Sequence, residues 1–88
     1  LVAPRVKLVF KKDIRLLTLS PNETAESFLL KISKDYGNYV IVEFRLSKSD
    51  LIVLHNNEDF EELYSLAQQK QLKGKTLRLT IRKRRERE

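Results

Sequence analysis

The sequence predicts a small α+β domain in which five strands and two helices follow one another in the order ββαββαβ. Two observations support this class. Short stretches alternate apolar with polar residues, as half-buried strands do, and two longer stretches repeat apolar residues at helical spacing. The chain has 88 residues, of which 41% are hydrophobic, and this supplies one core but not two. We therefore expect a mixed five-stranded sheet packed against two helices.

A basic hairpin is expected at the front of the chain, over residues 5–19 (RVKLVFKKDIRLLTL). In its first strand Val6, Leu8 and Phe10 alternate with other positions, one of which is Lys7. Successive side chains of a strand point to opposite faces, so this pattern predicts one face for the core and another that carries lysine into solvent.

The second strand of the hairpin is expected over residues 14–19, after a short polar break at Lys12 and Asp13. The charged residues from 5 to 15 are one acid, Asp13, and five bases: Arg5, Lys7, Lys11, Lys12 and Arg15. We interpret the basic side of this hairpin as the functional surface.

A first helix is expected from Ala25 to the residue before Gly37, which favours the C-cap position because glycine tolerates a positive φ. Thr24 is the preferred N-cap. A competing start places Ser20 at the N-cap with Pro21 at the first helical position, since Glu23 would complete a capping box.

The second half of the chain repeats this order with a hairpin, a helix and a last strand. The hairpin strands are YVIVEFRL, residues 39–46, and LIVL, residues 51–54. Either Asn56 or Asn57 is expected to cap the second helix. That helix should bury a stripe of four residues, and the last strand should bury three more: Phe60, Leu63, Tyr64 and Ala67, then Leu77, Leu79 and Ile81.

The order ββαββαβ is that of the ubiquitin-like β-grasp fold, in which the final strand lies beside the first. This places Arg78 and Arg82 near the basic hairpin. The three tyrosines, Tyr36, Tyr39 and Tyr64, are expected at the edge of the core with solvated hydroxyls.

Several classes of function find no support in the sequence. It has no cysteine, which excludes thiolate metal sites and disulfides and fits a reducing, cytoplasmic location. No apolar run approaches the roughly 20 residues that span a bilayer. A glycine-rich phosphate loop, a nucleophile with its base and metal-ligand spacing are all missing, and the single histidine, His55, fits a turn. We expect a protein that is not an enzyme and holds no cofactor or metal.

The sequence resembles the Phox and Bem-one (PB-one) interaction domains from Arg5 to Ile81. The resemblance lies in VKLVFKKDIRLLTL, in the helix that follows Thr24, and in SDLIVLHNNEDFEELYSLA. Domains of this family pair front to back, with basic residues of the first two strands on an acidic loop and helix of the partner. The acidic form carries an Asp-x-Asp/Glu-Gly-Asp loop before the fourth strand. Here that segment is LSKSD, which keeps only Asp50, so the resemblance implies the basic, type II form.

By this resemblance Lys7 matches the family's first-strand lysine and Arg15 its second-strand basic position, with Arg5, Lys11 and Lys12 as further contacts. Strict alternation places Arg15 on the face of Leu17 and Leu19. We therefore expect Arg15 at a frayed strand start or after a bulge, where it would reach the surface.

The function that the resemblance implies is heterodimerisation in a signalling or scaffold complex, through docking to the acidic loop of a type I PB-one domain. Residues 5–82 would form the interaction domain and residues 83–88 a charged tail or the start of a linker. Because most loop acids are missing, the isolated domain is expected to be a monomer.

Three alternatives stay open at this stage. The net charge of +6 and the tail RKRRERE suit nucleic acid, but no aromatic residues are interleaved with the bases, so nucleic-acid binding is not expected. A ubiquitin-like domain that binds a small GTPase would share the fold and pair through its second strand. Four acids of the second helix could form a second docking face, although a helix N-terminus favours acids in any case: Glu58, Asp59, Glu61 and Glu62.

Overall fold

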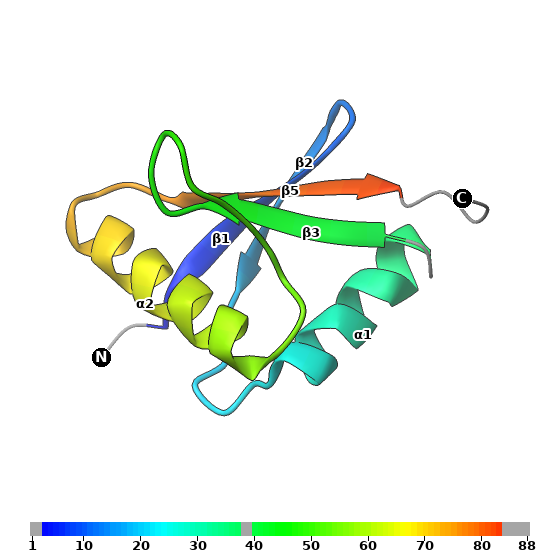
Figure 1. Cartoon of the computed structure of the whole chain (residues 1–88), viewed down its shortest axis with the longest axis horizontal. Helices are drawn as coiled ribbons and strands as arrows, with labels where there is room; N and C mark the ends of the chain where they lie inside the picture. The colour runs from blue at the N-terminus through cyan, green and yellow to red at the C-terminus, as the bar shows by residue number, and fades with distance from the viewer. Residues whose placement is uncertain (1–2, 38–39, 84–88) are drawn as a thin grey trace.

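The computed structural model describes residues 3–37 and 40–83 (Figure 1). The predicted order of elements is confirmed: β1 Arg5–Phe10, β2 Asp13–Thr18, α1 Ala25–Tyr36, β3 Val40–Arg45, β4 Leu51–Val53, α2 Asn57–Leu72 and β5 Leu77–Lys83. The strands form one mixed sheet in the order β2-β1-β5-β3-β4. The last strand lies beside the first and runs parallel to it, as the β-grasp order predicts.

The two helices lie on the same side of the sheet (Figure 1). The core between sheet and helices takes alternate residues of each central strand, the inner stripe of each helix, and Leu19 and Leu54 from the connections. From β5 it takes the predicted residues Leu77, Leu79 and Ile81. The alternating side chains of the strands point to the other side, which we call the open face.

The β1–β2 hairpin closes one residue earlier than expected. Phe10 pairs with Asp13, so the loop is Lys11 and Lys12, and Asp13 already belongs to β2. Lys11 has a φ of 56°. Two-residue hairpin loops require a positive φ at their first position, because only then does the turn match the twist of the strands.

Local signals place the helix ends as predicted. Thr24 caps α1, and its side chain accepts a hydrogen bond from the Ser27 amide at 3.1 Å. Gly37 ends α1 with a φ of 101°. Asn56 caps α2 by accepting from the Asp59 amide at 3.0 Å.

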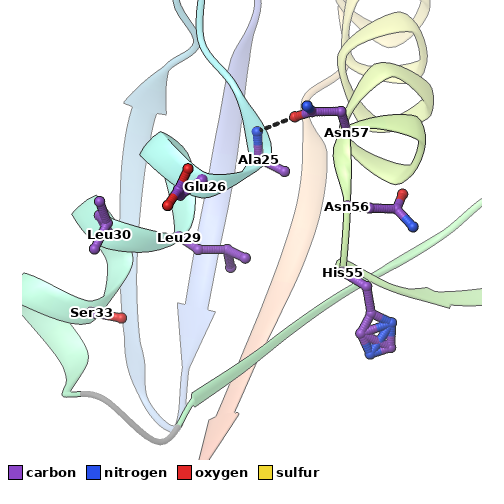
Figure 2. Close-up of a pocket in the computed structure, with 8 residues that line it drawn as sticks. All are labelled: Ala25, Glu26, Leu29, Leu30, Ser33, His55, Asn56 and Asn57. Atoms are coloured by element: carbon purple, nitrogen blue, oxygen red, sulfur yellow. Dashed lines mark hydrogen bonds between the residues drawn. The ribbon is translucent and has the colours of Figure 1, made fainter.

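Asn57, the alternative cap, has a different role. Its Oδ1 accepts the backbone N–H of Ala25 at 2.8 Å (Figure 2), so the first turn of α2 satisfies an amide at the start of α1. This bond fixes the two helix N-termini relative to each other.

The packed unit extends slightly beyond residues 5–82 at both ends. Pro4 is buried, and the Gln71 side chain bonds both the Ala3 carbonyl, at 3.3 Å, and the Arg5 amide, at 3.0 Å. Lys83, expected in the tail, is the last residue of β5 and pairs with Val40. The rest of the predicted tail, residues 84–88, lies outside the described residues.

Within the described parts of the chain, neither helix has the length and apolar character needed to cross a bilayer.

Candidate interaction surface

The open face carries the first-strand lysine at the centre of a cross-strand row. Lys7 alternates with the buried residues Val6 and Leu8, so its side chain points to the open face. In the sheet register it lies between Leu16 of β2 and Arg78 of β5. The prediction that Arg78 lies near the basic hairpin is therefore confirmed, because β5 is the direct neighbour of β1.

Lys7 and Arg78 have no counter-ion among the described residues. The ion pairs present there are Arg15 with Asp13, Lys31 with Glu23 and Arg82 with Glu43. The row from Lys7 to Arg78 therefore presents uncompensated positive charge from two adjacent strands.

Arg82 also points to the open face, but its charge is neutralised. Its Nε donates to Glu43 Oε2 at 2.8 Å, and Glu43 is only 9% exposed in the middle of the sheet. Arg82 pairs with Ile41 of β3 and lies beyond the part of β5 that pairs with β1. Because Ile81, the residue before it, pairs with Phe10, Arg82 lies near the loop end of the hairpin, as the fold class predicted.

Arg15 lies on the opposite side of the sheet from Lys7. The β1–β2 register runs without a bulge from Arg5 opposite Thr18 to Phe10 opposite Asp13, so the expected bulge or frayed start is wrong. Arg15 keeps its place on the helix side, opposite Leu8. Its side chain is nevertheless 55% exposed, because β2 is an edge strand.

The surroundings of Arg15 are an acid and an aromatic ring. Its Nε donates to Asp13 Oδ2 at 3.0 Å, and its guanidinium lies 5.5 Å from the ring centroid of Tyr36. The Tyr36 ring also packs against Phe10, with centroids 5.1 Å apart. Arg15 is therefore held against the end of α1, separated by the sheet from the row at Lys7.

Tyr36 itself differs from expectation. Its hydroxyl is buried and has no hydrogen-bond partner among the described residues, so the expected solvated hydroxyl is wrong. Burial raises the pKa of this hydroxyl because the phenolate loses its hydration, and the charge of Arg15 opposes that rise. The expectation for Tyr39 lies outside the described residues, and Tyr64 is half-buried on α2.

The remaining predicted residues are divided between the two ends of the hairpin. Arg5 shares the open face with Lys7, two residues away, and is exposed. Lys11 and Lys12 form the exposed loop, where the Lys11 ammonium lies 5.4 Å from the Phe10 ring centroid. Of the five predicted contacts, the structure thus brings Arg5 and Lys7 onto one face and places Arg15 on the other.

The exposure of two aliphatic residues on this surface was not predicted from the sequence. Ile14 and Leu16 point to the open face and are 58% and 59% exposed. These two residues alternate with Arg15 in an otherwise apolar run, and this pattern indicates that both faces of the strand are partly exposed to solvent. Arg45 was also missed. It follows the buried Phe44, shares the open face, and donates from Nη1 to the Lys48 carbonyl at 3.1 Å.

The acids of α2 lie on the helix side, away from Lys7. Three of them line a hollow together with Leu46, Ser65, Leu66 and Gln69: Glu58, Glu61 and Glu62. Asp59 instead accepts the His55 amide at 3.0 Å and so stabilises the start of the helix. The segment before β4, residues 46–50, has Asp50 as its one acid and contributes no carboxylate to this hollow.

A second hollow lies between α1 and the segment that leads into α2 (Figure 2). Leu29 points from α1 toward the side that carries His55, and the bond from Ala25 to Asn57 closes one end. This hollow is also on the helix side and is separate from the row at Lys7.

Fold and surface together define a ubiquitin-like β-grasp domain with a cationic open face. No family model and no curated protein matches the sequence. Among solved structures the AtNBR1-PB1 domain is similar, with a TM-score of 0.68, 13% identity, and coverage of 94% of this chain and 99% of that one. The chain therefore has the fold of a PB1 domain. PB1 is the PB-one family, so the fold implied by the sequence resemblance is confirmed.

Proposed function

We propose that this chain is a non-enzymatic PB1 module of the basic, type II kind, which binds the acidic loop of a type I PB1 domain in a cytoplasmic signalling or scaffold complex. The observation that supports this most is the pair of uncompensated cations, Lys7 and Arg78, in adjacent register on the open face. A partner with clustered carboxylates would neutralise both charges at one site.

Lys7 is the central contact in this proposal. It is partly buried between its neighbours, so a carboxylate that reaches its ammonium is partly desolvated as well. The β2 position beside it is Leu16 rather than a base. Arg78 of β5 supplies the second positive charge on this face, and Arg5 extends it along β1.

Arg15 has a secondary role in the proposed complex. It lies on the other side of the sheet and is already paired with Asp13. An exposed, paired cation contributes about 1 kcal/mol or less to binding. Arg15 would therefore reach only a partner segment that passes around the β2 edge.

Calorimetry with an acidic PB1 domain that carries the complete Asp-x-Asp/Glu-Gly-Asp loop tests the proposal. Lys7→Ala should weaken binding by about 30-fold or more, since loss of one member of a desolvated charge pair costs about 2–5 kcal/mol. The matched control is Lys34→Ala, which removes an exposed charge of α1 and should change affinity less than about twofold. Equal binding by wild type and Lys7→Ala would overturn the proposal.

The same proposal implies a monomer in isolation, because the hollow at Glu58, Glu61 and Glu62 lacks acids from the loop before β4. Sedimentation of the domain at rising micromolar concentrations should give one species. Chains that grow with concentration would show that the α2 acids form a second docking face. Duplex DNA should compete only weakly with the acidic domain at about 0.15 M salt, because phosphate binding is strongly screened.

A further inference from the structure

The outer edge of β2 is unpaired. In the sheet order β2-β1-β5-β3-β4 this strand has β1 on one side and no described segment on the other. It is six residues long, whereas β4 at the opposite edge has three. An unprotected edge strand offers a row of backbone donors and acceptors to another extended chain.

The alternation of hydrogen-bonded pairs in the β1–β2 hairpin shows which residues of β2 point their backbone N–H and C=O groups away from β1. The Leu19 amide donates to the Pro4 carbonyl at 2.8 Å, and this pair continues the β1–β2 register by one step. In antiparallel strands, hydrogen-bonded pairs alternate with pairs whose backbone groups point away. Leu19, directly after β2, therefore continues the set of residues whose backbone groups point toward β1. The residues of β2 whose backbone N–H and C=O groups point outward are Ile14, Leu16 and Thr18.

The two faces of this edge differ in chemistry. On the open face Ile14 and Leu16 are more than half exposed. On the helix side the exposed residue between them is Arg15. A strand added here would alternate its side chains between the two faces. One set would cover the aliphatic pair, and the other would meet the guanidinium.

The positive charge of the hairpin favours an acidic binding partner at this edge over a second copy of the chain. The hairpin that contains this edge carries one acid, Asp13, and five bases: Arg5, Lys7, Lys11, Lys12 and Arg15. A second copy of the chain paired through the same strand would bring these bases together, and like charges on facing strands are destabilising. An acidic segment would neutralise them.

We infer that the β2 edge binds an extended, acidic segment of a partner protein as an added strand, with alternating aliphatic and acidic side chains. Backbone bonds to Ile14, Leu16 and Thr18 would supply affinity, and the alternation would supply specificity. This binding mode uses the strand edge rather than the Lys7 row, so it does not rest on the proposed PB1 pairing.

A blocked peptide of sequence EVEVEVE tests the inference, with EEVVVEE as a control of equal composition. Hydrogen exchange measured by NMR should slow at the amides of Ile14, Leu16 and Thr18 when the alternating peptide is added. The exchange of the Arg15 amide, which already bonds β1, should change little. The control peptide should bind at least threefold more weakly, because it cannot place its acids on one face.

The decisive variant is Leu16→Pro. The N–H that proline removes points outward, so no hydrogen bond between β1 and β2 is lost. Proline is tolerated where the N–H position faces the free side of an edge strand. Peptide affinity should fall at least tenfold, whereas Leu16→Thr, which keeps the N–H, should lose clearly less. If Leu16→Pro does not fold, amide exchange in the wild-type protein with the alternating peptide bound still tests the inference.

Three results would overturn the inference. The first is unchanged peptide affinity in folded Leu16→Pro, which would show attraction by charge alone. The second is unchanged exchange at Ile14, Leu16 and Thr18 with peptide bound. The third is protection of these amides that rises with protein concentration in the absence of peptide, which would make a second copy the occupant.

Discussion

Glu43→Gln should lower stability and raise affinity for an acidic partner at the same time. The substitution keeps the shape of the side chain and removes the charge that holds Arg82 at 2.8 Å. The Glu43 side chain is 11% exposed, so its carboxylate is largely desolvated, but Arg82 is 54% exposed and can turn to water. We expect a loss of about 1–2 kcal/mol, at the lower end for a charge-assisted hydrogen bond.

The effect on binding follows from the sheet register. Glu43 is two strands and two residues from Lys7, through Thr80 and Val9, which corresponds to about 12 Å at ordinary strand spacings. One charge removed at that distance in water is worth about 0.3 kcal/mol before screening by salt. Affinity for an acidic PB1 domain should therefore rise, by less than about twofold.

Urea unfolding followed by circular dichroism measures the first effect and calorimetry the second. A loss of 1 kcal/mol corresponds to about 4–8 °C in the melting temperature of a domain of this size. Glu61→Gln is the control, because it makes the same charge change on exposed α2 without breaking a described ion pair. Unchanged stability in Glu43→Gln would show that the ion pair with Arg82 does not stabilise the fold, and a fall in affinity would show that the Glu43 charge does not oppose binding of an acidic partner.

Three further predictions concern stability. Lys11→Gly should stabilise the domain by about 0.5–1 kcal/mol in urea, because relief of a positive φ exceeds the entropy cost of glycine, and a destabilised variant would contradict this. Asn57→Ala should cost about 1–2 kcal/mol by leaving the Ala25 amide unpaired, while Asn57→Asp keeps the acceptor and should lose less; equal losses would count against the bond. The raised pKa of Tyr36 means that the folded state holds this proton more tightly, so the stability it contributes is complete below the ordinary value of 10.0 and falls as pH rises above it. Tyr36→Phe should weaken that alkaline decline in unfolding experiments, and an identical decline would contradict the burial effect.

Sequence patterns predicted what depends on neighbours along the chain. Alternation placed Val6 and Leu8 inside and Lys7 outside, and the first helix began after Thr24 as its capping chemistry indicates. Such features need only the period of the element and the hydrogen bonds of one turn. The position of Arg78 followed from the fold class, because β5 beside β1 is a property of that order.

Features that depend on strand order and lateral contacts could not be predicted in this way. Alternation correctly put Arg15 on the face of Leu17, but only the position of β2 at the edge explains how the side chain stays wet without a bulge. Nothing local links Glu43 to Arg82, which are 39 residues apart, or Asn57 to Ala25, which are 32 apart. These contacts exist because the fold brings distant segments together.

NMR mapping of the surface that contacts an acidic PB1 domain tests whether the open face around Lys7 is the docking surface. An acidic PB1 domain with an intact Asp-x-Asp/Glu-Gly-Asp loop would be added to the isotope-labelled chain, and shifts would be followed at backbone amides and at the lysine ammonium groups. We expect the largest changes at Lys7 and Arg78 on the open face, and we expect these changes to be lost in Lys7→Ala. Changes confined to α2, around Glu58 and Glu62, with Lys7 unaffected, would show that the open face is not the docking surface.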